Sequence, residues 1–231
     1  MNANEIAVIE QARAAPMLDQ TLQWVAVNSG TRNLAGLEQM ATLLRDAFSA
    51  LPGELNLVDP APVEAVDGAG NVLAIEHGRH LHLKVRPDAP VQMLFTGHMD
   101  TVFPADHPFQ AATWLPDGHL NAPGAADMKG GIAVMLAALK AVETSAVAPR
   151  FGYEVVLNSD EETGSFASAA LIAAAAKGKI AALTYEPALP DGTLAGARGG
   201  TGKASVALSV TGNDLDDHIA FAQGLCLCLE K

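Results

Sequence analysis

The chain has 231 residues, of which 49% are hydrophobic, which is enough for one large domain with a substantial core. Its formal net charge of −12 argues against nucleic acid or an anionic membrane surface as a partner, because both repel an acidic protein. The sequence contains no run of about 18 apolar residues, so no membrane-spanning helix is predicted. The N-terminus lacks the apolar core of an export signal, and the closely spaced Cys226 and Cys228 make an unlikely structural disulfide, so we expect a cytoplasmic protein.

Helical and strand patterns alternate along the chain, which is typical of an α/β protein. Apolar residues at helical spacing predict a helix over residues 3–29, broken near Pro16, and another over residues 34–50. Short apolar runs bounded by Pro, Gly or Asp predict strands at residues 71–77, 81–85 and 91–97. The elements expected after these are a helix at 127–145, a strand at 151–159, an Ala-rich helix at 165–178 and a strand at 179–187. A β-rich stretch with a different alternation then indicates a boundary within residues 190–199.

Polar residues directly follow three of the predicted strands. Ligands of an open α/β sheet bind beyond the carboxyl ends of its strands, so side chains at three such ends can converge even when they are far apart in sequence. The residues are His98 and Asp100, then Asp160, Glu161 and Glu162, then Glu186, with Asp127 ahead of a predicted helix as a further candidate.

Each of these features alone has an ordinary explanation. Three consecutive acids are usually a solvated turn, a His and an Asp two positions apart can be a chance pair in a loop, and an acid at a helix start is normally a cap. Together they predict a metal site, because a dinuclear zinc hydrolase needs several carboxylate and histidine ligands and a free carboxylate beside the bound water. Of the adjacent Glu161 and Glu162, one can bind metal while its neighbour takes the proton from water. Bound metal would also offset the repulsion among the acids.

Four motifs in this order, GHMDTV, GAADMKGG, NSDEETGS and YEPA, resemble those of the zinc-dependent aminoacylase/carboxypeptidase superfamily. This superfamily includes glutamate carboxypeptidase, acetylornithine deacetylase and succinyl-diaminopimelate desuccinylase. The resemblance covers residues 22–212 and is strongest to the glutamate-carboxypeptidase branch. It implies an α/β catalytic domain with a central, mostly parallel sheet flanked by helices. It also implies a hydrolase of amide bonds in small peptides or N-acyl amino acids.

The resemblance further implies the metal ligands. His98 would ligate one ion, and Glu186 would complete that site. Asp127 would bridge two ions, and Glu162 would ligate the second. A complete site would hold two Zn²⁺, for which Co²⁺ or Mn²⁺ are possible substitutes.

Two more roles follow from the same resemblance. Asp100 would support His98, and Glu161 would be the general base that takes a proton from zinc-activated water and returns it to the leaving amine. The peptide bond between Asp127 and Met128 would be cis.

The sequence departs from the family pattern after Gly212. Family members continue into a lid domain with a histidine that helps to bind the substrate carbonyl, but Asp216 stands at the matching position and His218 lies two residues away. A final histidine ligand near the family's C-terminus also has no counterpart. We therefore expect an incomplete catalytic domain over residues 1–198, and the start of a β-rich lid or dimerisation domain with a divergent tail over residues 199–231.

These departures leave alternatives to an active hydrolase. One is a truncated, catalytically incompetent fragment that binds one metal or none, and another is a structural acidic domain without metal. The family usually forms homodimers through the lid, most of which this chain lacks. His80 and His82 alternate along a strand as a solvated face would. Lys129 and Arg198 match positions near the family's site and hinge, but a surface role is equally open for them.

Overall fold

The protein is described by a computed structural model that covers residues 1–189 and 192–193. The predicted boundary and lid segment, together with Arg198, Asp216, His218, Cys226 and Cys228, lie outside these described residues. Met1–Val63 and Glu76–Ala197 form the main compact unit, and the hairpin segment Glu64–Ile75 belongs to a second unit. No helix in the described ranges is long and apolar enough to cross a membrane.

The main unit is built on a five-stranded sheet in the order β1-β4-β8-β5-β9. β5 runs parallel to β8 and to β9, whereas β4 runs antiparallel to β8 and to β1. The expected α/β fold is therefore confirmed, with a mixed sheet in which the parallel strands are the three that carry the candidate residues. The strands are β1 Glu54–Val58, β4 His80–Val85, β5 Val91–His98, β8 Phe151–Asn158 and β9 Ala181–Thr184.

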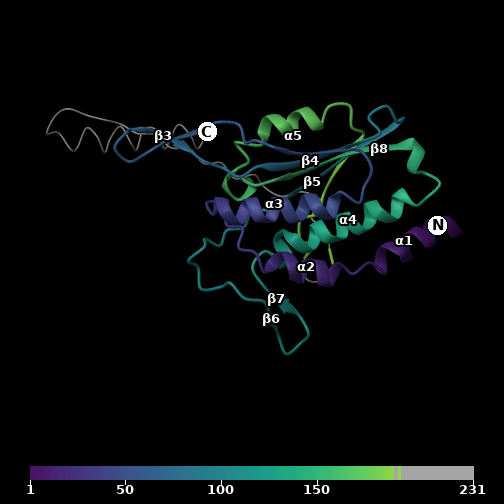
Figure 1. Cartoon of the computed structure of the whole chain (residues 1–231). Helices are drawn as coiled ribbons and strands as arrows, with labels where there is room; N and C mark the ends of the chain where they lie inside the picture. Colours follow the sequence, from purple (N-terminus) through teal and green to yellow (C-terminus); the bar gives the residue numbers. More distant parts are fainter. Residues whose placement is uncertain (190–191, 194–231) are drawn as a thin grey trace. The chain divides into compact units, whose positions relative to one another are not determined.

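Helices cover both faces of this sheet. α5 lies on one face, and α3 and α4 lie on the other, with α2 and α1 packed against α4 (Figure 1). Their bounds are α1 Ala3–Arg13, α2 Met17–Val25, α3 Leu34–Phe48, α4 Gly130–Glu143 and α5 Ala169–Ala175. The break at Pro16 and the helix from Leu34 are confirmed.

The central strand β8 is buried on both faces, which explains its nearly continuous apolar sequence. Tyr153, Val155 and Leu157 belong to the large core between the sheet and α2, α3 and α4. Val156 points the other way and packs with Leu94 and with α5 in a smaller cluster. Because both faces are filled, the polar residues that follow β8 emerge only at its carboxyl end.

Several elements differ from the sequence prediction. The helix expected from Asp127 begins only at Gly130, because the preceding segment Ala125–Lys129 has non-helical backbone angles at Asp127 and Met128. The Ala-rich helix is shorter than predicted. The strands β1, β2 (Val63–Val66), β6 (Thr113–Trp114) and β7 (Leu120–Asn121) were not predicted, since they are only two to five residues long and partly exposed.

The described part of the second unit is a β-hairpin. Its strands β2 (Val63–Val66) and β3 (Val72–Ile75) pair with each other. Asp67 closes the turn between them, since its carboxylate accepts hydrogen bonds from the main-chain N–H groups of Ala69 and Asn71.

Candidate metal centre

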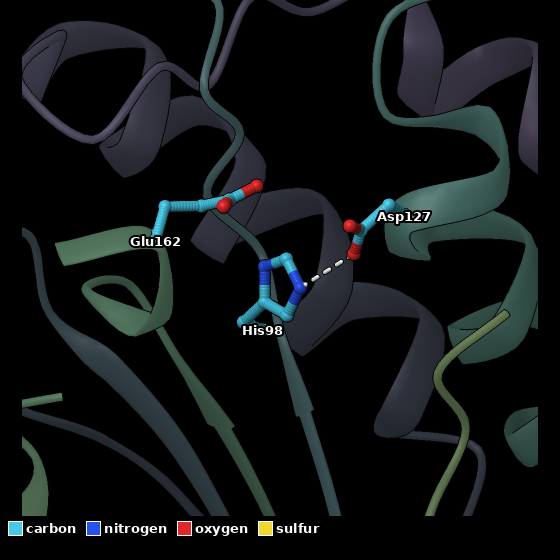
Figure 2. A group of neighbouring side chains, drawn as sticks. All are labelled: His98, Asp127 and Glu162. Carbon is cyan, nitrogen blue, oxygen red and sulfur yellow. Dashed lines mark hydrogen bonds and ion pairs between the residues drawn. The ribbon is translucent and has the colours of Figure 1, made fainter. Parts of the chain in front are cut away.

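The candidate residues converge at the carboxyl edge of the sheet, as the sequence predicts. His98 is the last residue of β5, and it pairs with Asn158, the last residue of β8. The acidic turn follows β8 directly, and Glu186 lies two residues after β9. Figure 2 shows the imidazole of His98 between the carboxylates of Glu162 and Asp127.

The ligand atoms of this group lie close to one another. Nε2 of His98 is 2.9 Å from Oδ1 of Asp127 and 3.7 Å from Oε1 of Glu186. His98, Asp127 and Glu162 each offer one ligand atom within 4.8 Å of the others. His98 is only 1% exposed, whereas the side chain of Asp127 is 53% exposed, so the group is open to solvent on the Asp127 side.

A sharp turn ahead of α4 presents Asp127. Gly124 opens the turn with a φ of 69°, a conformation that favours glycine, and its carbonyl accepts a hydrogen bond from the N–H of Lys129. The peptide bond between Asp127 and Met128 is cis, as the resemblance implied. Met128 is buried, and its sulfur accepts a hydrogen bond from the N–H of His98. Asp127 thus stands in a bent segment packed against β5 rather than in the first turn of the predicted helix.

A close backbone approach brings Glu186 to the same place. A side chain on Gly131, at the start of α4, would put its Cβ 2.0 Å from the carbonyl oxygen of Tyr185. Only glycine lets the segment after β9 lie this close to α4. Since Tyr185 precedes Glu186 and Gly131 follows the turn of Asp127, this contact sets the two carboxylates beside each other.

Asp100 contacts both His98 and the turn that carries Glu161 and Glu162. Nδ1 of His98 lies 3.0 Å from the carbonyl oxygen of Asp100 and 3.4 Å from its Oδ1. The carboxylate of Asp100 accepts hydrogen bonds from the main-chain N–H groups of Glu161 and Glu162, over 3.2 and 3.3 Å. It also accepts one from the hydroxyl of Thr31 over 2.7 Å. The contacts to Thr31 and to the acidic turn were not foreseen, because nothing in the sequence marks Thr31 as a partner of a residue 69 positions away.

The charges of the site favour a cation at this position. Burial acts to lower the pKa of His98, but the hydrogen bond to Asp100 and the charges of Asp100, Glu186 and Asp127 outweigh it and raise this pKa to about 10. Burial raises the pKa of Glu162, and the neighbouring acids, opposed by His98, contribute to a value of about 7. Burial and the nearby acids likewise raise the pKa of Glu186. Acids that hold a proton in this way would equally attract a divalent metal ion.

The donor set fits such an ion. One imidazole nitrogen and several carboxylate oxygens are ligands that zinc accepts, and His98 and the carboxylates already point toward a common centre. Of the site residues that the structure describes, His98 alone supplies a nitrogen.

The solvated face expected for His80 and His82 is wrong, and Lys129, for which surface and site roles were both open, is buried. Lys129 is 1% exposed, and burial lowers its pKa to about 8. His80 is buried against Ser159, at the end of β8. His82 contacts Glu154 across the sheet, with Nε2 2.6 Å from the carboxylate. Because His80 contacts the segment after β8 and His82 contacts the neighbouring strand, the alternation of the two histidines does not reflect solvent exposure.

A family model for peptidase family M20/M25/M40 matches residues 94–213, which is just over half of the chain and includes every candidate site residue. The chain belongs to this family. Carboxypeptidase G2 from Pseudomonas sp. (strain RS-16) is 35% identical over 133 residues, which are 56% of this chain and 31% of that protein. Succinyl-diaminopimelate desuccinylase 2 from Shewanella loihica is 40% identical over 81 residues, or 32% of this chain and 21% of that protein. The chain thus matches less than a third of the length of either M20 relative.

Solved structures of two peptidases share the fold. An M20 family metallo-carboxypeptidase from Sulfolobus solfataricus superimposes with a TM-score of 0.59 at 19% identity, over 77% of this chain and 39% of that chain. The di-peptidase Dug1p from Saccharomyces cerevisiae gives a TM-score of 0.58 at 14% identity, over 74% of this chain and 38% of that chain.

Proposed function

We propose that this chain carries the metal site of a hydrolase that cleaves amide bonds in small peptides or N-acyl amino acids. The observation that carries the proposal is the convergence of His98, Asp127 and Glu162, with ligand atoms within 4.8 Å of one another, at the carboxyl edge of an M20 fold. Membership of the family supports the reaction class. The names of the M20 relatives, a carboxypeptidase and desuccinylases, support substrates with an amide bond beside a free carboxylate.

In this proposal the ligands are His98, Asp127, Glu162 and Glu186. Zinc bound there would supply a positive charge that polarises the amide carbonyl and acidifies water. Glu161 lies in the same turn as Glu162 but is exposed, so its carboxylate would be free to take a proton from the attacking water and to return it to the leaving amine nitrogen. Asp100 would hold the imidazole of His98 and the main chain of Glu161 in position at the same time.

The number of ions is a separate part of the proposal. A first ion has a nitrogen ligand in His98, together with Asp127 and Glu186. A second ion would have Asp127 and Glu162, two carboxylates, among the described residues. Sites without a nitrogen or sulfur donor bind zinc weakly, so we expect one tight zinc ion and a second, weaker one.

A zinc titration of the metal-free chain tests the site. We expect one equivalent to bind tightly to the wild-type chain and to Glu161→Gln, and the tight equivalent to be lost in His98→Ala. Glu161→Gln is the matched control, because it changes an acid of the same turn that is not assigned as a ligand. Tight binding that survives His98→Ala, or no binding by the wild-type chain, would contradict the proposed site.

Hydrolysis is tested on the zinc-loaded chain with N-acyl glutamates and with dipeptides, by detecting the released amine. We expect hydrolysis that is abolished by Glu161→Gln, although this variant retains zinc. If the wild-type chain binds zinc and releases no amine from either substrate class, this chain is a metal-binding domain without hydrolase activity of its own.

A further inference from the structure

Asp160 is the acid of the NSDEETGS motif for which the proposed function has no use. It is fully buried at the end of β8, next to Glu161 and Glu162. Its carboxylate faces N–H donors: Oδ2 accepts hydrogen bonds from the main-chain N–H groups of Ala167 and Ser168, over 2.7 and 3.3 Å. Oδ1 accepts one from the side-chain amide of Asn158 over 3.2 Å. A buried carboxylate is tolerable only with several such donors.

The main chain of Asp160 holds the same loop. Its carbonyl oxygen accepts hydrogen bonds from the N–H groups of Thr163 and Ser165, both within 3.2 Å. Asp160 therefore contacts the loop near its beginning, through the carbonyl, and at its end, through the carboxylate. Hydrogen bonds to Asp160 therefore hold both ends of the loop formed by residues 160–168.

The amide of Asn158 extends this network. In addition to Asp160 it donates to the hydroxyl oxygens of Ser165 and Ser168, over 3.1 and 2.9 Å. In the same turn, the carboxylate of Asp100 accepts hydrogen bonds from the main-chain N–H groups of Glu161 and Glu162. Two buried carboxylates, Asp100 and Asp160, thus hold the backbone of one short turn from two sides.

We propose that Asp160 is a positioning residue of the metal site: it fixes the loop 160–168 so that the carboxylate of Glu162 is held beside His98 and Asp127. This inference rests on the proposed function, since it takes Glu162 to be a metal ligand. Asp160 itself touches neither metal nor substrate. Outer residues that orient metal ligands typically change metal affinity by roughly 10- to 100-fold when they are replaced.

The test is the zinc affinity of Asp160→Asn, measured by competition with a chelating dye at a temperature where circular dichroism shows a folded chain. Asparagine keeps the size of the side chain but replaces one acceptor oxygen with an NH₂ group, which must face one of the N–H donors. We expect zinc to bind roughly 10- to 100-fold more weakly. We also expect faster amide hydrogen exchange in residues 161–168, with unchanged protection in β8, because only the loop loses its closure.

Asp67→Asn is the matched control. The carboxylate of Asp67 also accepts hydrogen bonds from two main-chain N–H groups and from an asparagine side chain, but it lies in the turn of the β2–β3 hairpin. We expect its replacement to leave the zinc affinity unchanged. An equal loss of affinity in Asp67→Asn would mean that general destabilisation is responsible and would overturn the inference.

If Asp160→Asn fails to fold, the zinc affinity of Asn158→Ala tests the inference instead. It removes three hydrogen bonds to the loop and keeps the buried carboxylate, and we expect zinc affinity to fall in the same direction. If folded Asp160→Asn binds zinc with wild-type affinity, this inference is overturned and the proposed function stays intact. The same holds for Asn158→Ala if Asp160→Asn does not fold. A wild-type chain that binds no zinc would overturn both.

Discussion

The ammonium group of Lys129 donates a hydrogen bond to the carbonyl oxygen of Val27 over 2.9 Å, and another to that of Trp24 over 3.2 Å. Trp24 is in the last turn of α2 and Val27 lies just beyond the helix, where few main-chain donors are left for the carbonyl groups. Lys129 stands two residues after Asp127 in the bent segment before α4. It therefore ties the turn that presents Asp127 to the end of a helix about 100 residues earlier in the chain.

Replacing Lys129 with methionine tests this tie. The apolar stem is retained, but the carbonyl of Val27 loses the ammonium donor and that of Trp24 keeps only main-chain N–H donors, which costs about 1–3 kcal/mol. Removing the buried ammonium offsets part of this cost, so we expect the free energy of unfolding in urea to fall by about 1 kcal/mol. Lys140→Met, at an exposed position of α4, is the control and should change stability by less than about 0.5 kcal/mol. Equal stability of the two variants would show that the buried contact contributes nothing.

The hydroxyl of Thr31 is expected to matter for metal binding, because it donates to the carboxylate of Asp100 that also holds Glu161 and Glu162. Thr31→Val keeps the shape of the side chain and removes this donor. We predict roughly ten-fold weaker zinc binding in a competition assay.

Thr21→Val is a matched control for this prediction. Thr21 is exposed to the same 7% as Thr31, but its hydroxyl donates to the carbonyl of Met17 within α2. Its replacement should leave zinc binding unchanged. The same zinc affinity in both variants would rule out a role for Thr31 in the site.

Zinc is also expected to stabilise the fold, because it would bind the assembled acids of the native state and not the separated acids of the unfolded chain. At a free concentration 100 times the dissociation constant, this stabilisation is about 2.7 kcal/mol and raises the melting temperature. A chelator should reverse the shift. Glu162→Gln should reduce the shift and Glu161→Gln should retain it, and identical shifts in both variants would contradict the assignment of Glu162 as the ligand of the pair.

The parts of the site that the sequence predicts are those set by local pattern. An apolar run followed at once by polar residues marks the end of a buried strand, and three such ends, after β5, β8 and β9, lie side by side in the structure. The convergence of His98 and Glu186 follows from this rule alone, since parallel neighbouring strands end at one edge. The roles of the individual residues came from the family resemblance and remain predictions.

The parts that the sequence did not predict depend on contacts between distant segments. The burial of Lys129 follows from the packing of α2 against the turn before α4, and no local pattern distinguishes it from a surface lysine. The bent backbone at Asp127 looks helical in sequence because good helix-forming residues surround it. His80 and His82 follow the alternation of an exposed strand face, but they contact Ser159 and Glu154, which lie more than 70 positions later in the chain.

Glu154 of β8 contacts two nitrogen groups: its carboxylate lies 2.7 Å from the ammonium of Lys179 and 2.6 Å from Nε2 of His82. Burial acts to raise the pKa of Glu154, but the hydrogen bonds from Lys179 and His82, together with the charges of Lys179 and Lys84, lower it below its ordinary value of 4.5. Glu154→Gln would leave the nearly buried ammonium of Lys179 without a counter-charge. We predict a loss of about 1–3 kcal/mol in the free energy of unfolding at neutral pH.

The pH dependence of this loss follows from the direction of the pKa shift. Because the carboxylate has a lower pKa in the folded than in the unfolded chain, its stabilising contribution is present above pH 4.5 and is lost as the pH falls through the folded value. Urea unfolding of the wild-type chain and of Glu154→Gln should therefore differ by a constant amount near neutral pH and converge in more acidic solution. Glu64→Gln, in the exposed part of β2, should match the wild-type chain near neutral pH. A difference between wild type and Glu154→Gln that persists unchanged below pH 4.5 would mean that lost packing, and not the ion pairs of Glu154, explains its effect.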